Sequence, residues 1–212
     1  MQEITLPTDP SMVIVTKDLT KEFAGVAAVS EVSLALPKGK IFGFIGPSGC
    51  GKTTTVRLMV GTYKPTSGEV TVLGRAPREF RRQERESIGY MPQQFVLYPD
   101  LTVRQNLNFA ASLYGLGWRE RRARQAAMLD LVELTEHAHK IAQNISGGMQ
   151  RRLSLASTMM HDPELLFLDE PTAGVDPVLR NKFWDYFRAL QERGHTLFIT
   201  TQYVNEAAYC DY

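Results

Sequence analysis

Cysteine is scarce in this sequence, and its scarcity excludes a fold built on disulfide bonds. Only Cys50 and Cys210 occur in the 212 residues, and they lie far apart. Small secreted proteins that depend on disulfides contain many more cysteines, so we expect a reducing compartment. The first ten residues have neither a basic start nor an apolar run, so we expect no secretory signal. Residues 1–11 have the composition of a loose leader.

Long hydrophobic runs are also missing. The longest apolar stretches, residues 41–45 and 165–168, are far shorter than the roughly 20 residues that a transmembrane helix needs. If the protein works at a membrane, we therefore expect another chain to do the spanning.

An excess of charge of one sign is absent as well. Lys and Arg together number 24, Asp and Glu number 23, and the net charge is +1. A protein that coats nucleic acid would carry a strongly basic surface, so nucleic acid is not an expected partner. The 16 Gly and 11 Pro are too few for a low-complexity chain. The length instead fits one globular domain, or one domain with a lobe, whose core needs no disulfide.

Short apolar runs alternate with segments of helical periodicity. Strands are predicted at residues 12–15, 32–36, 41–45, 70–74, 87–93, 165–170 and 196–201. Helices are predicted over residues 56–60 before Gly61, in several stripes over residues 101–160, and over residues 178–193 before Gly194. Strands that alternate with helices on both sides of a helical segment predict an α/β domain with a mainly parallel sheet.

Two charged runs allow two interpretations each. Residues 75–87 mix Arg and Glu, which indicates a solvated helix or loop, or else a basic contact patch. Arginines at positions 119, 121, 122 and 124 open a predicted helix. They either form an exposed helix face or contact phosphates or lipid head groups.

The sequence GPSGCGKTTT, which begins at residue 46, fits the phosphate-loop pattern G-x-x-x-x-G-K-[ST]. It follows a predicted strand and opens a predicted helix, so backbone N–H groups and the helix N-terminus would surround phosphate oxygens. We expect Lys52 to reach the β- and γ-phosphates and the Thr53 hydroxyl to bind Mg²⁺. Cys50 is either a reactive thiol at a helix N-terminus or a small loop filler. The candidate nucleotide-binding residues of this phosphate loop are Gly46, Pro47, Ser48, Gly49, Cys50, Gly51, Lys52, Thr53 and Thr54.

An apolar strand that ends in two acids supplies the other half of such a site. Asp169 and Glu170 follow the run at residues 165–168. At the end of a strand, Asp169 can hold Mg²⁺ and Glu170 can polarise the attacking water. Phosphoryl transfer depends mostly on positioning and charge neutralisation, which these residue types provide.

Residues 145–150, ISGGMQ, resemble the L-S-G-G-Q signature of the ATP-binding-cassette (ABC) ATPases. The resemblance spans residues 12–212. It implies a P-loop NTPase (RecA-like) core with an N-terminal antiparallel β subdomain and an inserted α-helical subdomain. The implied parts are residues 12–97 (core and β subdomain), 98–162 (helical subdomain) and 163–212 (core continued). The family usually continues further, so the core is expected to be truncated at Tyr212.

The resemblance also implies roles for the signature segment, residues 145–150. In the family this segment sits at a helix N-terminus and binds the γ-phosphate of ATP that the opposite subunit holds. Ser146, Gly147 and Gly148 match the pattern, whereas Ile145 and Met149 depart from it. The departures are tolerable, because the phosphate contact uses the serine and the backbone.

Four further positions are assigned only through the resemblance. Phe23 stands where an aromatic ring would stack on adenine, although a lone Phe is more often a core residue. Gln93, or the adjacent Gln94, resembles the glutamine that senses Mg²⁺ and contacts the membrane subunit. Residues 173–176 resemble the D-loop, which crosses the dimer interface. Gln202 replaces the family's switch histidine; its amide can donate to a γ-phosphate oxygen but cannot titrate.

The implied function is ATP binding and hydrolysis by a subunit of an ABC transporter that powers export through a separate membrane permease. The phrases YPDLTV, SGGM and TTQY resemble the drug- and antibiotic-exporting branch. ATP and Mg²⁺ are the implied cofactors, and a peripheral place on the cytoplasmic face of the membrane is the implied location. The implied partners are the permease and a second ATP-binding subunit, in a homodimer or pseudo-dimer.

Two other functions stay open at this point. A degenerate nucleotide-binding module would dimerise with little turnover; Gln202 favours this alternative and Glu170 opposes it. A soluble ABC ATPase would act on nucleic acid or ribosomes. Such proteins split their motifs with a long coiled coil or carry paired cassettes, whereas a compact helical segment separates Lys52 from Asp169 here.

Overall fold

The strands form two separate sheets in the computed structural model, which describes residues 11–94 and 96–212. The antiparallel sheet has the order β2-β1-β4 and contains β1 (Met12–Phe23), β2 (Val26–Pro37) and β4 (Ser67–Val72). The parallel sheet has the order β3-β7-β6-β5 and contains β3 (Ile41–Ile45), β5 (Ile88–Met91), β6 (Leu165–Asp169) and β7 (Thr196–Thr201). The leader predicted at residues 1–11 lies outside the described residues except for Ser11.

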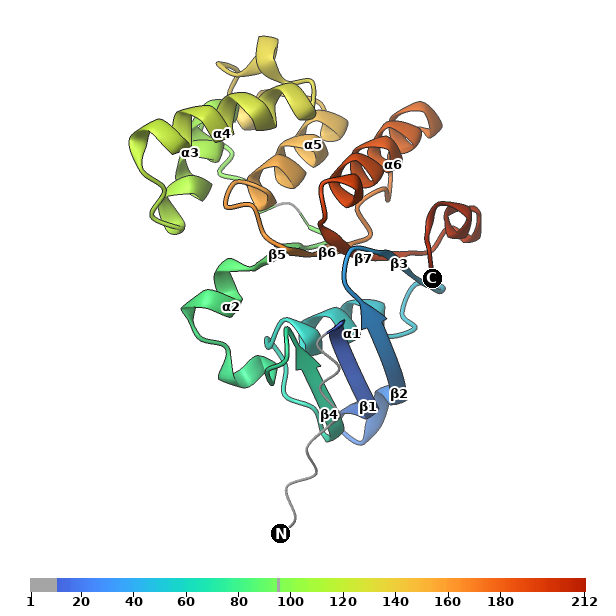
Figure 1. Ribbon diagram of the computed structural model, residues 1–212. Helices are drawn as coiled ribbons and strands as arrows, with labels where there is room; N and C mark the ends of the chain where they lie inside the picture. Colours follow the sequence, from blue (N-terminus) through green and yellow to red (C-terminus); the bar gives the residue numbers. More distant parts are fainter. Residues whose placement is uncertain (1–10, 95) are drawn as a thin grey trace.

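Helices cover both faces of the parallel sheet (Figure 1). The α-helices are α1 (Lys52–Met59), α2 (Arg82–Glu86), α3 (Val103–Leu113), α4 (Trp118–Leu131), α5 (Gly147–Thr158) and α6 (Pro177–Glu192). Short 3₁₀ helices are η1 (Pro77–Glu79), η2 (Thr135–His137), η3 (Ala142–Asn144) and η4 (Val204–Tyr209). Helices α3 to α6 lie on one side of the sheet, and α1 with the antiparallel sheet lies on the other (Figure 1).

The parallel sheet separates two hydrophobic cores. Successive side chains of a strand point to opposite faces. On β6, Leu166 and Leu168 therefore pack in the core under the helices α3 to α6, whereas Leu165 and Phe167 pack in the core with α1 and the antiparallel sheet. All four are fully buried, which explains the unbroken apolar run of this strand. The predicted α/β fold with a mainly parallel sheet is confirmed.

The first two strands are longer than the alternation of apolar residues predicted. β1 and β2 form a hairpin in which Phe23 pairs with Val26 across a two-residue turn. Both turn residues, Ala24 and Gly25, have positive φ angles of 48° and 80°, as a two-residue hairpin turn of the I′ type requires. Register shifts within the hairpin break the alternation, and Ala-Gly is not the usual turn dipeptide. These two departures hid the hairpin from sequence reasoning.

Local capping explains where the longer helices begin and end. Thr102 caps α3: its hydroxyl accepts a hydrogen bond from the amide of Gln105, whose side chain accepts one from the amide of Thr102. Asp176 caps α6 in a similar way, with Pro177 in the first position. α6 ends just before Gly194, whose φ of 94° suits a helix stop.

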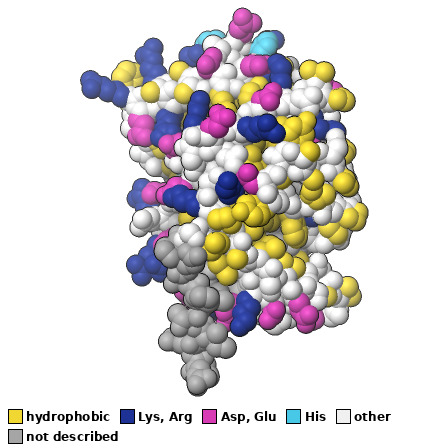
Figure 2. Space-filling view, turned by 45° about the vertical axis from the view of Figure 1, so that its right-hand side comes forward, with side chains coloured by type: hydrophobic (Ala, Val, Ile, Leu, Met, Phe, Trp, Pro, Cys, Tyr) yellow, Lys and Arg dark blue, Asp and Glu magenta, His cyan; other side chains and the backbone are white. Residues whose placement is uncertain are grey.

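The charged run at residues 75–87 contains η1 and α2, and several of its charges are paired with one another. The guanidinium of Arg75 lies 2.8 Å from the carboxylate of Glu84, and that of Arg82 lies 2.6 Å from Glu86. On the face shown in Figure 2, Lys and Arg side chains are interspersed with Asp and Glu. The pairing favours the solvated-helix interpretation over a basic contact patch.

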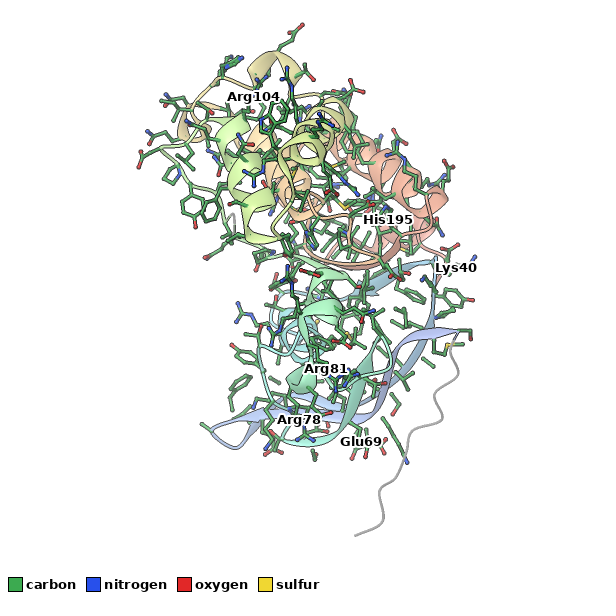
Figure 3. The ribbon with its side chains drawn as sticks, turned by 60° about the vertical axis from the view of Figure 1, so that its left-hand side comes forward. Lys40, Glu69, Arg78, Arg81, Arg104 and His195 are labelled. Atoms are coloured by element: carbon green, nitrogen blue, oxygen red, sulfur yellow. The ribbon has the colours of Figure 1, made fainter. Side chains whose placement is uncertain are left out.

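The second arginine run lies on α4, at the other end of the molecule. Arg124 pairs with Asp162 at 2.9 Å, which joins α4 to the loop before β6. Figure 3 shows Arg104 among the helices at one end, and Arg78 and Arg81 at the opposite end. The two basic runs therefore do not merge into one positive face. Within residues 11–94 and 96–212, no helix is both long enough and apolar enough to cross a bilayer.

Candidate active site

The phosphate loop connects the end of β3 to the start of α1 and depends on two of its glycines. Gly49 and Gly51 have φ angles of 83° and 95°, a region that side chains rarely adopt. A Cβ atom on Gly51 would lie only 2.2 Å from the carbonyl oxygen of Ala28 in β2. The loop backbone can therefore turn into the helix only because residue 51 has no side chain. This turn leaves the first N–H groups of α1 at the loop.

Lys52 is almost completely buried at the first position of α1, with 4% of its surface exposed. Its ammonium group donates hydrogen bonds to the carbonyl oxygens of Gly46 at 2.7 Å and Pro47 at 3.0 Å. It also lies 3.1 Å from Oε1 of Glu170, which is buried as well. Burying a charged side chain is costly unless it is paired, and the contact between Lys52 and Glu170 supplies that pairing.

The two acids at the end of β6 are held by Thr200 of the neighbouring strand β7. The Thr200 hydroxyl donates to Oδ1 of Asp169 at 2.6 Å and accepts from the amide of Glu170 at 2.9 Å. Thr200 was not among the predicted site residues. The parallel register, in which Asp169 pairs with Thr200, is what brings it to the acids.

Glu170 adopts a strained backbone conformation. Its φ angle is 50°, in the left-handed region, which costs a non-glycine residue about 1–2 kcal/mol. Its amide donates to the Thr200 carbonyl, and its carbonyl accepts from the amide of Ala173, so the surroundings enforce this conformation. Strain of this kind concentrates at functional sites, where it fixes the direction of a side chain.

Two predicted glutamines reach this cluster from different loops. The side-chain amide of Gln93, in the loop after β5, donates to Oε2 of Glu170 at 2.9 Å. Gln202, directly after β7, accepts a hydrogen bond from the Ser48 hydroxyl of the phosphate loop at 3.0 Å. The contact with Glu170 favours Gln93 over the alternative Gln94.

The predicted metal ligands Asp169, Thr53 and Gln93 carry oxygen atoms of the kind that Mg²⁺ prefers. Oδ2 of Asp169 is buried and has no hydrogen-bond partner among the described residues, so an acceptor is available beside the partnered Oδ1. Thr53 supplies a hydroxyl and Gln93 an amide oxygen. No cluster of three or more His, Cys, Asp and Glu side chains that could hold a metal occurs in the described part of the chain. Mg²⁺ suits this set, because it uses one or two carboxylates together with substrate phosphates.

The signature segment lies away from the phosphate loop. Ser146 is the N-cap of α5, and its hydroxyl accepts from the amide of Met149 at 3.3 Å. Ser146 and Gly147 are exposed, whereas a Cβ on Gly148 would lie 2.6 Å from a methyl group of Leu179 in α6. α5 and α1 lie on opposite faces of the parallel sheet (Figure 1). The structure therefore does not bring these residues together with the phosphate loop of the same chain.

Phe23 stands at the end of β1 with 43% of its surface exposed. Its ring contacts the edge of Tyr63 at a centroid distance of 5.4 Å, and the ammonium of Lys21 lies 5.1 Å from its centre. Because its ring is exposed, Phe23 is not a core residue, which was the alternative to a role at the adenine.

A buried carboxylate that sequence reasoning missed joins the segments that follow β6 and β7. Glu206 is fully buried in η4 and accepts a hydrogen bond from the Thr172 hydroxyl at 2.8 Å. Arg180 lies 3.6 Å from the same carboxylate, and its guanidinium also stacks 3.9 Å from the ring centre of Tyr203. No local sequence signal marks Glu206, because its burial depends on how η4 folds back onto α6.

Comparisons with known proteins agree with this geometry and with the resemblance inferred from the sequence. The family model described as "ABC transporter" matches residues 29–173. The probable multidrug ABC transporter ATP-binding protein YbhF of Escherichia coli (strain K12) is 43% identical over 204 residues, 96% of this chain and 35% of that protein. The Nod factor export ATP-binding protein I of Rhizobium etli is 38% identical over 190 residues, 90% of this chain and 60% of that protein. This chain thus spans about a third of the first relative and three fifths of the second.

A solved structure supports the fold assignment independently. The dimeric structure of a post-hydrolysis state of the ATP-binding cassette MJ0796, bound to ADP and Pi, matches with a TM-score of 0.84 and 27% identity. The match covers 93% of this chain and 91% of that one. The predicted P-loop NTPase core with its antiparallel β subdomain and inserted helices is thereby confirmed.

The buried pair of Lys52 and Glu170 predicts a strong energetic coupling. Lys52→Met should destabilise the protein by about 3–5 kcal/mol, because it leaves a buried carboxylate without its counter-charge. In the Glu170→Gln background the same substitution should cost at least 1 kcal/mol less, by the order of magnitude of contacting pairs. Urea unfolding of the parent, both single variants and the double variant, without nucleotide, measures the coupling. Effects that add within about 0.5 kcal/mol would contradict it.

The two cysteines predict a selective alkylation. Cys50 is exposed in the phosphate loop, whereas burial raises the pKa of the Cys210 thiol to about 11. At pH 8 only about a thousandth of Cys210 is thiolate, the reactive form. Iodoacetamide at pH 8 should therefore modify Cys50 first, and MgATP should slow that reaction if Cys50 lies at bound phosphate. Peptide mass spectrometry reads both sites; equal labelling of the two cysteines would refute the selectivity.

Proposed function

Because the chain belongs to the ABC transporter family, we propose that it binds and hydrolyses ATP as the nucleotide-binding subunit of an exporter. The observation that carries the proposal is the convergence of Lys52, Gln93 and Glu170. Lys52 begins α1, and Gln93 and Glu170 lie in the loops after β5 and β6, all at the carboxyl edge of the parallel sheet. Lys52 and Gln93 both contact the Glu170 carboxylate. Ligands of open α/β sheets bind at this edge.

Binding of ATP is expected to change the partner of Lys52. The phosphates would accept hydrogen bonds from the N–H groups of the phosphate loop, where α1 begins. Lys52 would then exchange its contact with Glu170 for contacts with the β- and γ-phosphate oxygens, because a polyphosphate carries more charge than one carboxylate. Nucleotide binding would therefore break the ion pair and free the Glu170 carboxylate from Lys52.

Glu170 is the proposed general base. A water molecule that donates to its carboxylate attacks the γ-phosphorus. The new P–O bond forms as the bond to the β,γ-bridging oxygen breaks, and the water's proton passes to Glu170. Gln93 donates to the other carboxylate oxygen and so holds the base in one orientation.

Mg²⁺ supplies charge neutralisation on the phosphates when it is bound. Asp169, Thr53 and Gln93 are the residues proposed to hold it. The buried, unpartnered Oδ2 of Asp169 supports this choice, and Thr200 keeps the Asp169 side chain in place through its other oxygen.

Gln202 is proposed to contact the γ-phosphate. Its hydrogen bond with Ser48 places it beside the phosphate loop, and its amide N–H₂ can donate to a phosphate oxygen. Phe23 is proposed to stack on the adenine ring, which its exposure permits.

A second ATP-binding subunit is proposed to complete the site. Ser146 and Gly147 are exposed at the N-terminus of α5, where a helix end attracts phosphate, yet they lie across the sheet from α1. In a dimer, the signature segment of one chain, with Ser146, Gly147 and Gly148, would contact the γ-phosphate on the other chain. The partner is another copy or a related cassette.

A separate permease is the other proposed partner. The relatives named above are a probable multidrug ABC transporter ATP-binding protein and a Nod factor export ATP-binding protein, which supports export as the direction of transport. The proposed location is the cytoplasmic face of the membrane, where the chain would be peripheral. Glu170 in contact with Lys52 and Gln93 favours an active enzyme over a degenerate module.

Loss of the Glu170 charge should separate ATP binding from turnover. Glu170→Gln should bind MgATP with affinity within a few-fold of the parent but release phosphate about 10²–10⁴-fold more slowly, the usual scale for loss of a general base. Phosphate release and binding of a fluorescent ATP analogue measure the two effects. Glu136→Gln, at an exposed carboxylate on η2, is the matched control and should behave as the parent. Parental turnover in Glu170→Gln would disprove the assigned role.

Bulk and charge at Ser146 should block assembly without harming ATP binding. Ser146→Arg, made in the Glu170→Gln background, should abolish the ATP-dependent dimer and leave the nucleotide affinity of the monomer within about threefold, a difference below 1 kcal/mol. Size-exclusion chromatography with and without MgATP reads the dimer. Ser112→Arg, at an exposed serine on α3, is the control. A fall in monomer nucleotide affinity far beyond threefold would contradict the two-chain site.

A further inference from the structure

We propose that Arg151 is a positioning residue that ties the helix of the signature segment to both loops around Glu170. The inference rests on the proposed function for its consequence, whereas its geometry stands on the contacts alone. Arg151 lies on α5, five positions after Ser146, and only 5% of its surface is exposed.

The guanidinium of Arg151 contacts two different loops. Nη1 donates to the carbonyl oxygen of Gln93 at 2.9 Å, in the loop after β5. Nη2 donates to the carbonyl oxygen of Ala173 at 3.0 Å, in the loop after β6. Each carbonyl belongs to a loop that follows a different strand of the parallel sheet. One planar side chain thus fixes the separation of the two loops and their distance from α5.

Gln93 and Ala173 also contact Glu170, which begins the loop after β6. The side chain of Gln93 donates to the Glu170 carboxylate at 2.9 Å, and the amide of Ala173 donates to the Glu170 carbonyl at 3.1 Å. Arg151 therefore bonds to two residues, Gln93 and Ala173, that each hydrogen-bond to the proposed base. Burial lowers the pKa of Arg151, and the nearby charge of Glu170 acts in the opposite direction, which ties the buried cation electrostatically to the same carboxylate.

The neighbouring Arg152 also lies on α5, but its contacts are with the segment that follows α4. Its Nη1 donates to the Val132 carbonyl at 2.9 Å and lies 3.4 Å from the carboxylate of Glu133. Both partners follow α4, on the same side of the sheet as α5. Arg151 instead reaches across to the carboxyl edge of the sheet. Arg151 therefore contacts the loops of the site, whereas the adjacent Arg152 contributes to helix packing.

The arrangement gives α5 a mechanical connection to the site. A movement of α5 when its N-terminus binds the phosphate of a second subunit is passed through Arg151 to the carbonyls of Gln93 and Ala173. Gln93 and Glu170 then move together, because the guanidinium is rigid and holds both loops. Turnover thereby becomes sensitive to the engagement of Ser146, while nucleotide affinity of the single chain does not depend on Arg151.

The test compares Arg151→Met and Arg151→Lys with Arg152→Met and Arg152→Lys. Hydrogen exchange without nucleotide reads the geometry independently of turnover. Arg151→Met should speed amide exchange at residues 93–94 and 172–176, whereas Arg152→Met should speed it near residues 130–134. Unchanged exchange in both site loops of Arg151→Met would overturn the proposal, whether or not the protein hydrolyses ATP.

Kinetics of the same variants read the consequence. Arg151→Met should lower kcat by up to about 100-fold, the cost of misplacing a reacting group by about 1 Å, with KM and ATP affinity within about threefold. Arg151→Lys keeps the charge but cannot span both carbonyls, so it should recover only part of kcat; if the Met variant fails to fold, this variant carries the test. Both Arg152 variants should keep kcat within about threefold. Equal losses of kcat in the Arg151 and Arg152 variants, in proportion to lost Tm, would refute a positioning role.

A parent protein that releases no phosphate with its permease would disprove the proposed function instead. The hydrogen-exchange comparison would still decide whether Arg151 holds the two loops. The two failures are therefore distinguishable.

Discussion

The cost of burying one carboxylate organises the site of this protein. Glu170 is buried at the end of β6 and strained at its backbone, so it must find compensation from neighbouring groups. Lys52 supplies the counter-charge, Gln93 supplies a hydrogen bond, and Thr200 fixes the backbone. These partners come from three different segments of the chain. Their contacts with Glu170 therefore hold the start of α1, the loop after β5 and strand β7 close together. The same cost makes the site responsive, because a ligand that draws Lys52 away changes the surroundings of Glu170.

The parallel sheet determines what one chain can and cannot assemble. Its carboxyl edge gathers the phosphate loop, the two acids and both glutamines, since parallel strands end at the same side. Its two faces keep α1 apart from α5, so the exposed Ser146 is directed away from the phosphates of its own chain. This layering is the basis for proposing a site made of two halves from two chains. Arg151 connects α5, whose N-terminus carries the signature segment, to two loops at the carboxyl edge of the sheet.

Glutamine at position 202 offers an amide where the resemblance to the ABC ATPases implies a histidine. Its hydrogen bond with Ser48 keeps it beside the phosphate loop, where an amide can donate but cannot carry a proton. Charge near the γ-phosphate then comes from Lys52 alone among the residues proposed to contact it in this chain. The buried Glu206, held by Thr172 and close to Arg180, stabilises the turn that follows Gln202.

The sequence by itself determined the parts whose geometry is local. A phosphate loop, a strand ending in acids and a glycine pair at a helix start each use consecutive residues, so their spacing along the chain carries the chemistry. The apolar runs likewise predicted the parallel sheet, because buried strands read as continuous apolar segments. Only the tertiary structure decided which of these parts meet. The contacts of Gln93 with Glu170 and of Arg151 with Gln93 join residues 77 and 58 positions apart, and they depend on strand order and on α5 packing against the sheet. Thr200, Arg151 and Glu206 carry no sequence signal, because their roles arise from burial and register, which no short segment of the chain determines.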